Sequence, residues 1–201
     1  METVKYSTEN KNCTITLNRP EKRNAFNAQL VNDLKAAFTD AERDDAIKVI
    51  ILKGEGKVFS AGADLSYLQS LQNNSYEENI TDSKNLMELY KQIYTLSKPV
   101  IAQIEGHAIA GGCGLAIVCD FSYSVPEAQF GYTEVKIGFI PAIVMVFLLR
   151  KINERNAKEL LLTGKLVDAA NAKELGLINE VVDADKINAH VLNVANELIE
   201  N

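Results

Sequence analysis

The pattern of hydrophobic and polar residues predicts alternating strands and helices in the first part of the chain. Residues Cys13–Leu17 alternate as in a half-buried strand, which stops just before Pro20. Asn27 is a favourable N-cap, and apolar residues after it recur at helical spacing up to about Arg43. The β-branched run Ile47–Leu52 predicts a strand covered on both faces. Strand, helix and strand form a crossover unit.

The same order recurs further along the chain. A polar helix is predicted from about Ser83 to Leu96, followed by a strand at Val100–Ile104. A helix of small residues begins at about Gly111. Val118–Val125 is a further predicted strand, although Asp120 is an unfavourable residue for a fully buried position.

Beyond Pro141 the pattern is mostly helical. Asn153 begins a predicted helix that runs through Leu162. Asp168 caps a helix that ends at Gly176, and Asp183 begins the last one. The chain is therefore expected to be a single α/β domain over residues 1–201, with a core in 1–150 and a helical C-terminal part in 151–201.

Composition and charge narrow the possible functions. The 201 residues are 47% hydrophobic and 24% charged, as in ordinary soluble proteins. The net charge of −6 is spread along the chain without a basic block, which argues against nucleic acid as a partner. The N-terminus lacks the features of a signal peptide, and the longest apolar run, Phe139–Leu149, is too short to span a membrane. We expect a cytoplasmic protein.

The cysteines and histidines give no indication of a metal site. Cys13, Cys113 and Cys119 form no Cys-x-x-Cys pair, and we interpret them as small buried hydrophobic residues. His107 is expected to pack beside a glycine turn, and His190 to face solvent on the last helix. No Ser or Cys lies in a nucleophile elbow.

Two loops of small residues are candidate anion sites. Phe59–Leu65 and Glu105–Gly114 each follow a predicted strand and lead into a helix, so that backbone N–H groups are left without helical partners. Their glycines match neither a dinucleotide fingerprint nor a P-loop. Taken alone, the first loop is also explained by a tight strand-to-helix turn. The second is also explained by close packing of two helices through small residues. Together they would supply two backbone donors to one oxyanion, such as a thioester enolate.

The third candidate is Glu134, within residues 128–141, a segment rich in Phe, Tyr, Ile and Gly. Burial among apolar neighbours raises the pKa of a carboxyl group toward the range that suits general acid–base catalysis. The alternative is a solvated acid paired with Lys136.

The sequence resembles the crotonase (enoyl-CoA hydratase/isomerase) superfamily over residues 15–181. The matching segments, in the family's order, are Ile15–Pro20 with Asn24-Ala25, Phe59–Leu65, Lys98–Ala102, Gly106 with Ala110–Gly112, Cys119-Asp120, Phe130, Glu134-Val135, Ile137–Pro141 and Leu175–Val181. The resemblance implies a spiral of ββα and βαβ turns forming two sheets. It also implies assembly as a homotrimer or a dimer of trimers.

The resemblance also implies roles for individual residues. The amides of Ala63 and Gly111 would form an oxyanion hole, and Glu134 would be a catalytic glutamate. Coenzyme A would enter as part of an acyl-CoA substrate, without a separate cofactor or metal. The implied substrate- and CoA-binding residues are Arg23, Asn24, Ala25, Ala61, Asp64, Leu65, Gly112 and Gly114.

Two departures from the family pattern keep alternatives open. The hydratases' other glutamate is replaced by Gly114, and the chain stops at Asn201 in a helical part that is short for the family. Segments around Gly62–Asn79 and Gly138–Arg150 are similar to the bacterial methylglutaconyl-CoA hydratase branch. The expected activity is syn hydration of a methylglutaconyl-CoA-like or short-chain enoyl-CoA. The alternatives are a Δ3,Δ2-enoyl-CoA isomerase that uses one glutamate, and a catalytically weak CoA-ester-binding protein.

Overall fold

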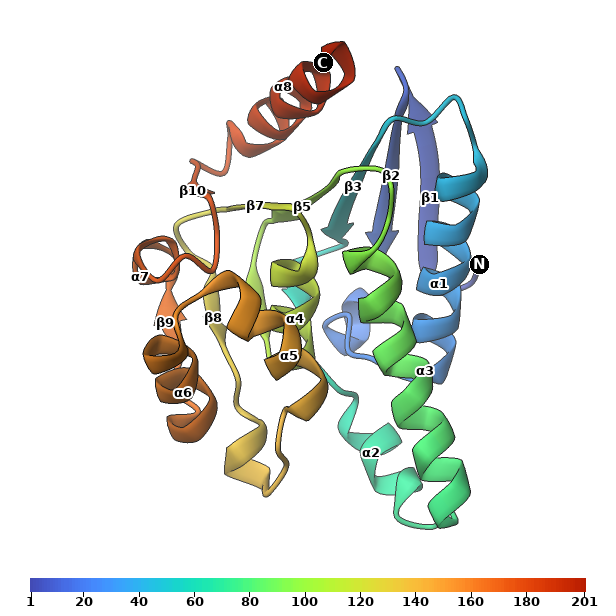
Figure 1. The fold of residues 1–201 in the computed structure, drawn as a ribbon, viewed down its shortest axis with the longest axis vertical. Helices are drawn as coiled ribbons and strands as arrows, with labels where there is room; N and C mark the ends of the chain where they lie inside the picture. Colours follow the sequence, from blue (N-terminus) through green and yellow to red (C-terminus); the bar gives the residue numbers. More distant parts are fainter.

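Ten strands form two sheets in the computed structural model, which describes residues 1–201 (Figure 1). The larger sheet has the order β1-β2-β3-β5-β7-β10, antiparallel between β1 and β2 and parallel elsewhere. Its strands are β1 (Val4–Glu9), β2 (Asn12–Leu17), β3 (Val49–Gly54), β5 (Val100–Ile104), β7 (Phe121–Ser124) and β10 (Glu180–Val181).

The smaller sheet has the order β4-β6-β8-β9. Its first three strands are parallel, and β9 is antiparallel to β8. Its strands are β4 (Val58–Ser60), β6 (His107–Ile109), β8 (Gln129–Gly131) and β9 (Val167–Asp168).

Helices lie around the two sheets (Figure 1). They are α1 (Ala28–Arg43), α2 (Leu65–Leu71), α3 (Tyr76–Tyr94), α4 (Gly111–Val118), α5 (Ala142–Lys151), α6 (Glu154–Thr163), α7 (Ala169–Glu174) and α8 (Ile187–Glu200), with short 3₁₀ turns η1 (Pro20–Lys22) and η2 (Glu134–Ile137). None of the helices combines the length and hydrophobicity needed to cross a membrane.

A repeated unit connects the sheets. Strands β3, β5 and β7 of the larger sheet are each followed directly by a strand of the smaller sheet, namely β4, β6 and β8. A helix or 3₁₀ turn comes next in each case: α2, α4 and η2. The expected α/β spiral is therefore confirmed.

One buried hydrophobic cluster continues from the sheets into the C-terminal helices. It includes Leu52 and Ile101 of the larger sheet, Leu160 of α6 and Val191 of α8. Helix α8 packs against β3, β5 and β7. The C-terminal part therefore covers the core that the strands begin.

Most predicted elements of the first 120 residues are confirmed. Asn27 caps α1 by accepting a hydrogen bond from the Leu30 amide, and β5 has the predicted bounds. The three cysteines are free and buried, as expected. Strand β2 is more buried than its alternating pattern predicted, because it is an interior strand and even Asn12 and Thr16 are covered.

Several predicted boundaries are wrong. Helix α3 begins at Tyr76 instead of Ser83, because Ser75 and Glu78 form a capping box there. Strand β7 begins only at Phe121, and Asp120 before it is exposed and accepts a hydrogen bond from the Val100 amide. Helix α8 begins at Ile187, after a turn at Asp183.

The placements expected for the histidines are also wrong. His107 is exposed, and its Nδ1 accepts a hydrogen bond from the Gln129 amide. His190 packs edge-on against Tyr123 with ring centroids 4.7 Å apart, so that only 32% of its side chain is exposed.

The buried side chain of Asn24 holds the segment before α1 against the β3–β4 connection. Its amide nitrogen donates to the carbonyl oxygens of Glu55 (3.0 Å) and Val58 (2.8 Å). Its Oδ1 accepts from the Arg19 amide at 2.9 Å. A single side chain therefore bonds three backbone groups and joins the two segments.

We predict that Asn24→Asp destabilises the fold by about 2–4 kcal/mol, because a carboxylate oxygen would face two carbonyl oxygens and both donated hydrogen bonds would be lost. Urea unfolding would measure the change. The matched control is Asn27→Asp, in which aspartate caps a helix as well as asparagine and the stability should hardly change. Equal midpoints for the two variants would contradict the bridging role of Asn24.

Candidate active site

The three candidate segments meet at one edge of the smaller sheet. Strands β4, β6 and β8 are neighbours and run parallel, so their carboxyl ends lie at the same edge. β4 leads into residues 61–64, β6 into Ala110 and α4, and β8 into residues 132–133 and η2. The sequence predicted that the two small-residue loops directly follow the longer strands β3 and β5. The short strands β4 and β6 stand between them and bring the loops together.

Two backbone amides are available at this edge. The N–H of Ala63 makes no hydrogen bond within the chain, and Gly111 is the first residue of α4, where an amide has no helical acceptor. The two loops are in contact: a Cβ added to Gly62 would lie 2.7 Å from the Ala110 Cβ and 3.3 Å from the Gly111 nitrogen. Gly62 has φ +86°, so glycine is favoured there for both space and conformation.

Ala110 turns the chain sharply between β6 and α4. Its φ of 55° and ψ of −127° are rarely adopted by a residue with a Cβ. Its amide donates to the Gly131 carbonyl at 2.7 Å, which ties the turn to β8. Backbone strain of this kind costs on the order of 1–3 kcal/mol and clusters at functional sites.

The loop that carries Ala63 is anchored to the segment before α1. The Phe26 amide donates to Gly62 at 2.7 Å, and the Asp64 amide donates to Phe26 at 2.9 Å. The Asp64 carboxylate pairs with Arg19 at 3.1 Å and accepts from the Ser66 amide and hydroxyl. The pKa of Asp64 is lowered mainly by the Ser66 hydrogen bond, with a further contribution from Arg19.

Glu134 is the first residue of η2 and is largely shielded from solvent. Its Oε2 is buried without a hydrogen-bond partner. Burial raises the pKa of its carboxyl group. It forms no ion pair, so the alternative of a solvated acid paired with Lys136 is wrong.

A cavity of about 470 Å³ brings Ala63, Gly111 and Glu134 together. It lies between the α2–α3 side of the molecule and the segment formed by η2 and α5, which are on opposite sides of the lower half of Figure 1. The lining is mostly apolar and includes Ala61 and Leu65. The remaining lining residues are Phe26, Asn27, Val31, Tyr67, Leu68, Leu71, Asp82, Ser83, Asn85, Leu86, Tyr90, Ala110, Thr133, Ile137, Phe139, Ile140, Pro141, Ala142, Ile143 and Val144.

The other predicted binding residues lie beside or behind this cavity. Arg23 is exposed, and its carbonyl accepts from the Ala61 amide at 3.0 Å. Ala25 is buried, like Asn24 and Asp64, whose side chains hold the loops in place. Gly112 and Gly114 are buried in α4 and do not line the cavity.

Gly114 leaves no free space where the family resemblance places a glutamate. A Cβ added there would lie 2.3 Å from Cγ1 and 2.8 Å from Cβ of Val144, and 3.2 Å from the ring of Tyr90. Val144 of α5 therefore occupies this position. No pattern in the sequence indicates which apolar residue of α5 packs there.

Tyr90 was not among the predicted site residues. It is fully buried in α3, yet it lines the cavity, and its hydroxyl donates to the Gly111 carbonyl at 2.6 Å. Burial raises its pKa well above the usual value, and the Glu134 charge adds to this effect. The tyrosine thus remains a neutral donor that orients Gly111. Its spacing from Leu89 and Ile93 indicates only a buried helix face.

A model of the enoyl-CoA hydratase/isomerase family matches residues 7–201. The chain belongs to this family. Its members are enzymes, and the match spans both sheets and the C-terminal helices. The crotonase resemblance of the sequence is thereby confirmed.

Individual relatives agree with the family match. The chain is 46% identical over 155 residues to a Thermus thermophilus member, a match that covers 77% of this chain and 61% of that protein. The crystal structure of a Legionella pneumophila member, described as a crotonase, superposes with a TM-score of 0.94 at 38% identity, covering 97% of this chain and 75% of that one. An enoyl-CoA hydratase from Bacillus anthracis gives a TM-score of 0.92 at 30% identity, covering 99% and 77%.

The packing at Gly114 gives the second prediction. Gly114→Ala should destabilise the protein by about 1–3 kcal/mol, because the added methyl group overlaps Val144. In a Val144→Ala background the same substitution should cost less, by a coupling energy of about 1 kcal/mol. Denaturant unfolding of the two single variants and the double variant measures this coupling. Strict additivity would show that the two residues do not compete for space.

The burial of Glu134 gives the third prediction. Burial raises the pKa of Glu134 in the folded state, so the folded protein binds this proton more tightly than the unfolded chain does. The resulting stabilisation is lost as the pH rises through the folded-state pKa. Glu134→Gln should therefore be more stable than the parent at pH 7, and the difference should disappear below about pH 4. Urea midpoints at both pH values test this. A variant less stable than the parent at pH 7 would contradict it.

Proposed function

We propose that the chain is an acyl-CoA-processing enzyme that adds water to an α,β-unsaturated acyl-CoA. The observation that carries the proposal is the shared cavity of Ala63, Gly111 and Glu134, in which two unpaired amides lie with one desolvated carboxyl group. Membership of the enoyl-CoA hydratase/isomerase family supports it.

The amides would stabilise the charge that develops during the reaction. The thioester carbonyl oxygen would accept hydrogen bonds from the N–H groups of Ala63 and Gly111. As a bond forms at the β-carbon, negative charge moves onto this oxygen, and fixed donors stabilise it without reorganising. The contact between the two loops, the Ala110 turn and the Tyr90 hydrogen bond hold the donors in position.

Glu134 would move the protons. Burial raises its pKa and so favours the protonated form relative to a solvated glutamate, and in that form the carboxyl group can give its proton to the α-carbon. The water oxygen forms a bond to the β-carbon, and the proton that this water loses returns to the carboxylate. One group can thus serve both steps, and the overall change is the addition of H and OH on one face.

The coenzyme A part would lie along the outer loops. Arg23 is exposed, and its carbonyl accepts a hydrogen bond from the Ala61 amide in the loop that carries Ala63. The proposed groove for the adenine and pantetheine groups follows the backbone of residues 23–25 and that of Asp64 and Leu65. The side chains of Asn24 and Asp64 are engaged within the protein, so they would act by shaping the groove.

An isomerase is the second candidate, because Val144 fills the space at Gly114 where the hydratases' other glutamate is expected, and Glu134 lines the cavity with the two amides. Shifting a double bond from the 3,4 to the 2,3 position needs one group that removes a proton at the α-carbon and returns it at the γ-carbon. No water is consumed in that reaction.

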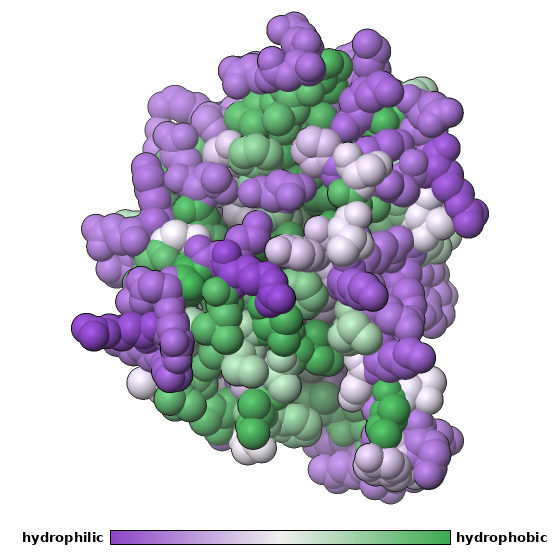
Figure 2. Space-filling view, viewed as in Figure 1, coloured by the Kyte–Doolittle hydropathy of each residue, from purple (hydrophilic) through white to green (hydrophobic).

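Assembly as a trimer or a pair of trimers stays a prediction. Exposed apolar side chains gather around η2 and α5, where Figure 2 shows a hydrophobic area on the face toward the viewer. They include Ile137, Phe139, Ile140 and Leu149. Such a surface is typical of regions covered by another molecule.

The fourth prediction tests the role of Glu134. Glu134→Gln should fold and bind an acyl-CoA, and should lose about 10²–10⁴-fold in turnover of crotonyl-CoA, because amide groups do not exchange protons at the required rate. The matched control is Glu127→Gln at an exposed position, with parental turnover expected. The assay follows loss of absorbance of the conjugated thioester.

Isotopically labelled water separates the two candidate reactions. A hydratase places the labelled oxygen at the β-carbon, whereas an isomerase converts a 3-enoyl-CoA to the 2-enoyl-CoA without incorporating it. Unchanged turnover in Glu134→Gln would refute the assigned role. Calorimetric binding of acyl-CoA without turnover of either substrate would support the third possibility, a CoA-ester-binding protein.

A further inference from the structure

The cavity that holds the candidate catalytic groups contains two carboxyl groups and no cation. Asp82 lies on the α3 side and Glu134 on the η2 side. No Lys, Arg or His is among the lining residues. Neither carboxyl group takes part in an ion pair. A ligand in this cavity would therefore meet two carboxyl groups and no cationic side chain.

Asp82 is held in place by a tyrosine from the neighbouring helix. The Tyr67 hydroxyl of α2 donates to Asp82 Oδ1, and this contact links α2 to α3 across the cavity wall. Burial, followed by this hydrogen bond, raises the pKa of Tyr67. The tyrosine therefore stays neutral as a donor, and the pair keeps its negative charge at the carboxylate.

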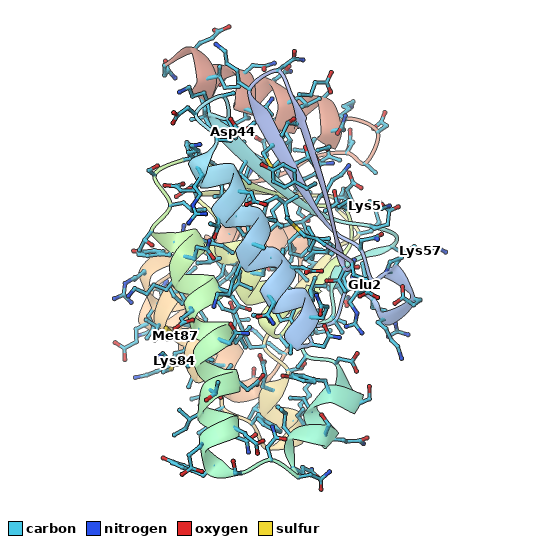
Figure 3. The ribbon with its side chains drawn as sticks, turned by 90° about the vertical axis from the view of Figure 1, so that its right-hand side faces the viewer. Glu2, Lys5, Asp44, Lys57, Lys84 and Met87 are labelled. Atoms are coloured by element: carbon cyan, nitrogen blue, oxygen red, sulfur yellow. The ribbon has the colours of Figure 1, made fainter.

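The surface outside Asp82 carries more negative than positive charge. An outer hollow, also lined by Asp82, contains Glu77, Glu78 and Glu88. Lys84 is its only cation, lies along the outer side of α3 in Figure 3, and does not line the inner cavity. Glu88 is paired with Lys35 of α1 at 2.8 Å, so the negative charge outside Asp82 comes mainly from Glu77 and Glu78.

We propose that Asp82 is a specificity-determining residue that makes the cavity select acyl groups without a second carboxylate. The inference rests on the proposed function, since it takes an acyl-CoA as the ligand, and it names the substrate class as neutral, apolar acyl chains. Of the two acyl classes that the sequence leads us to expect, it favours the short-chain enoyl group over the methylglutaconyl group.

The physical reason is the absence of a partner for a terminal carboxylate. With the thioester oxygen at the Ala63 and Gly111 amides, the acyl chain would extend into the same cavity, which Glu134 and Asp82 both line. A carboxylate at its end would lose water and gain no cation. It would also be repelled by Asp82, and like charges placed together are an effective means of rejecting a wrong ligand.

The fifth prediction compares two saturated, non-reacting thioesters of similar shape by isothermal titration calorimetry. Glutaryl-CoA ends in a carboxylate, and 5-methylhexanoyl-CoA carries two methyl groups in place of its carboxylate oxygens. The parent chain should bind the neutral thioester at least about 100-fold more tightly. Asp82→Asn should narrow this ratio at least about tenfold through tighter binding of glutaryl-CoA.

The design controls for folding and for net charge. Asparagine keeps an oxygen that accepts from Tyr67, so Asp82→Asn preserves the α2–α3 contact. Asp45→Asn makes the same charge change at an exposed position outside the cavity and should retain the parental ratio. Similar affinities of the parent for the two thioesters would overturn the proposal. A large parental ratio that persists in Asp82→Asn would also overturn it, because the selection would then arise elsewhere.

Turnover assays on the unsaturated counterparts separate this inference from the proposed function. Selective binding without hydration of 5-methylhex-2-enoyl-CoA would leave the inference standing and refute the hydratase. Hydration of this thioester and glutaconyl-CoA with equal efficiency would support the hydratase and refute the inference. A chain that binds neither thioester would overturn both.

Discussion

The candidate site depends on the parallel pairing of three short strands, β4, β6 and β8. Each has three residues, and each ends where a functional segment begins. Parallel neighbours place their carboxyl ends at one edge, so the pairing fixes the relative position of Ala63, Gly111 and Glu134 before any side chain contributes. Ligand sites at this end of parallel strands follow from the same geometry in other α/β proteins.

Small residues make this arrangement possible, because the loops approach each other at backbone distance. A Cβ on Gly112 would lie 2.4 Å from the Ser60 carbonyl oxygen, so β4 and α4 can only be this close with glycine there. The Ser60 hydroxyl donates to the Asn24 carbonyl at 2.8 Å, which ties the same strand to the segment before α1. This close packing and the hydrogen bonds around it offset the free energy that the unfavourable backbone conformation of Ala110 costs.

The sequence predicts the long elements well, because their signals are local. The N-cap at Asn27 and the apolar runs of β3 and β5 suffice to place α1 and two strands. It does not reveal three-residue strands, since so few residues show no periodicity and their pairing partners are distant in the chain. The early start of α3 follows from its capping box, a local signal that the apolar pattern alone does not include.

The same distinction applies to the site. The two small-residue loops and Glu134 can be found from residue types and from family resemblance. Tyr90 and Asp82 cannot, because what makes them relevant is which part of α3 faces the cavity, and this depends on how α3 packs against α1, α2 and α4. A tyrosine and an aspartate on a helix otherwise look like ordinary core and surface residues.

The close packing of Val144 against Gly114 constrains the order in which these two positions of the chain can change. Introducing a carboxylate at position 114 as a single step would produce a poorly packed intermediate, which selection for a folded protein would remove. The residue on α5 must become smaller first, and that change by itself brings no new chemistry. Position 114 can therefore accept a larger side chain at low cost only after position 144 has become smaller, so the packing of α5 determines which residues α4 can carry.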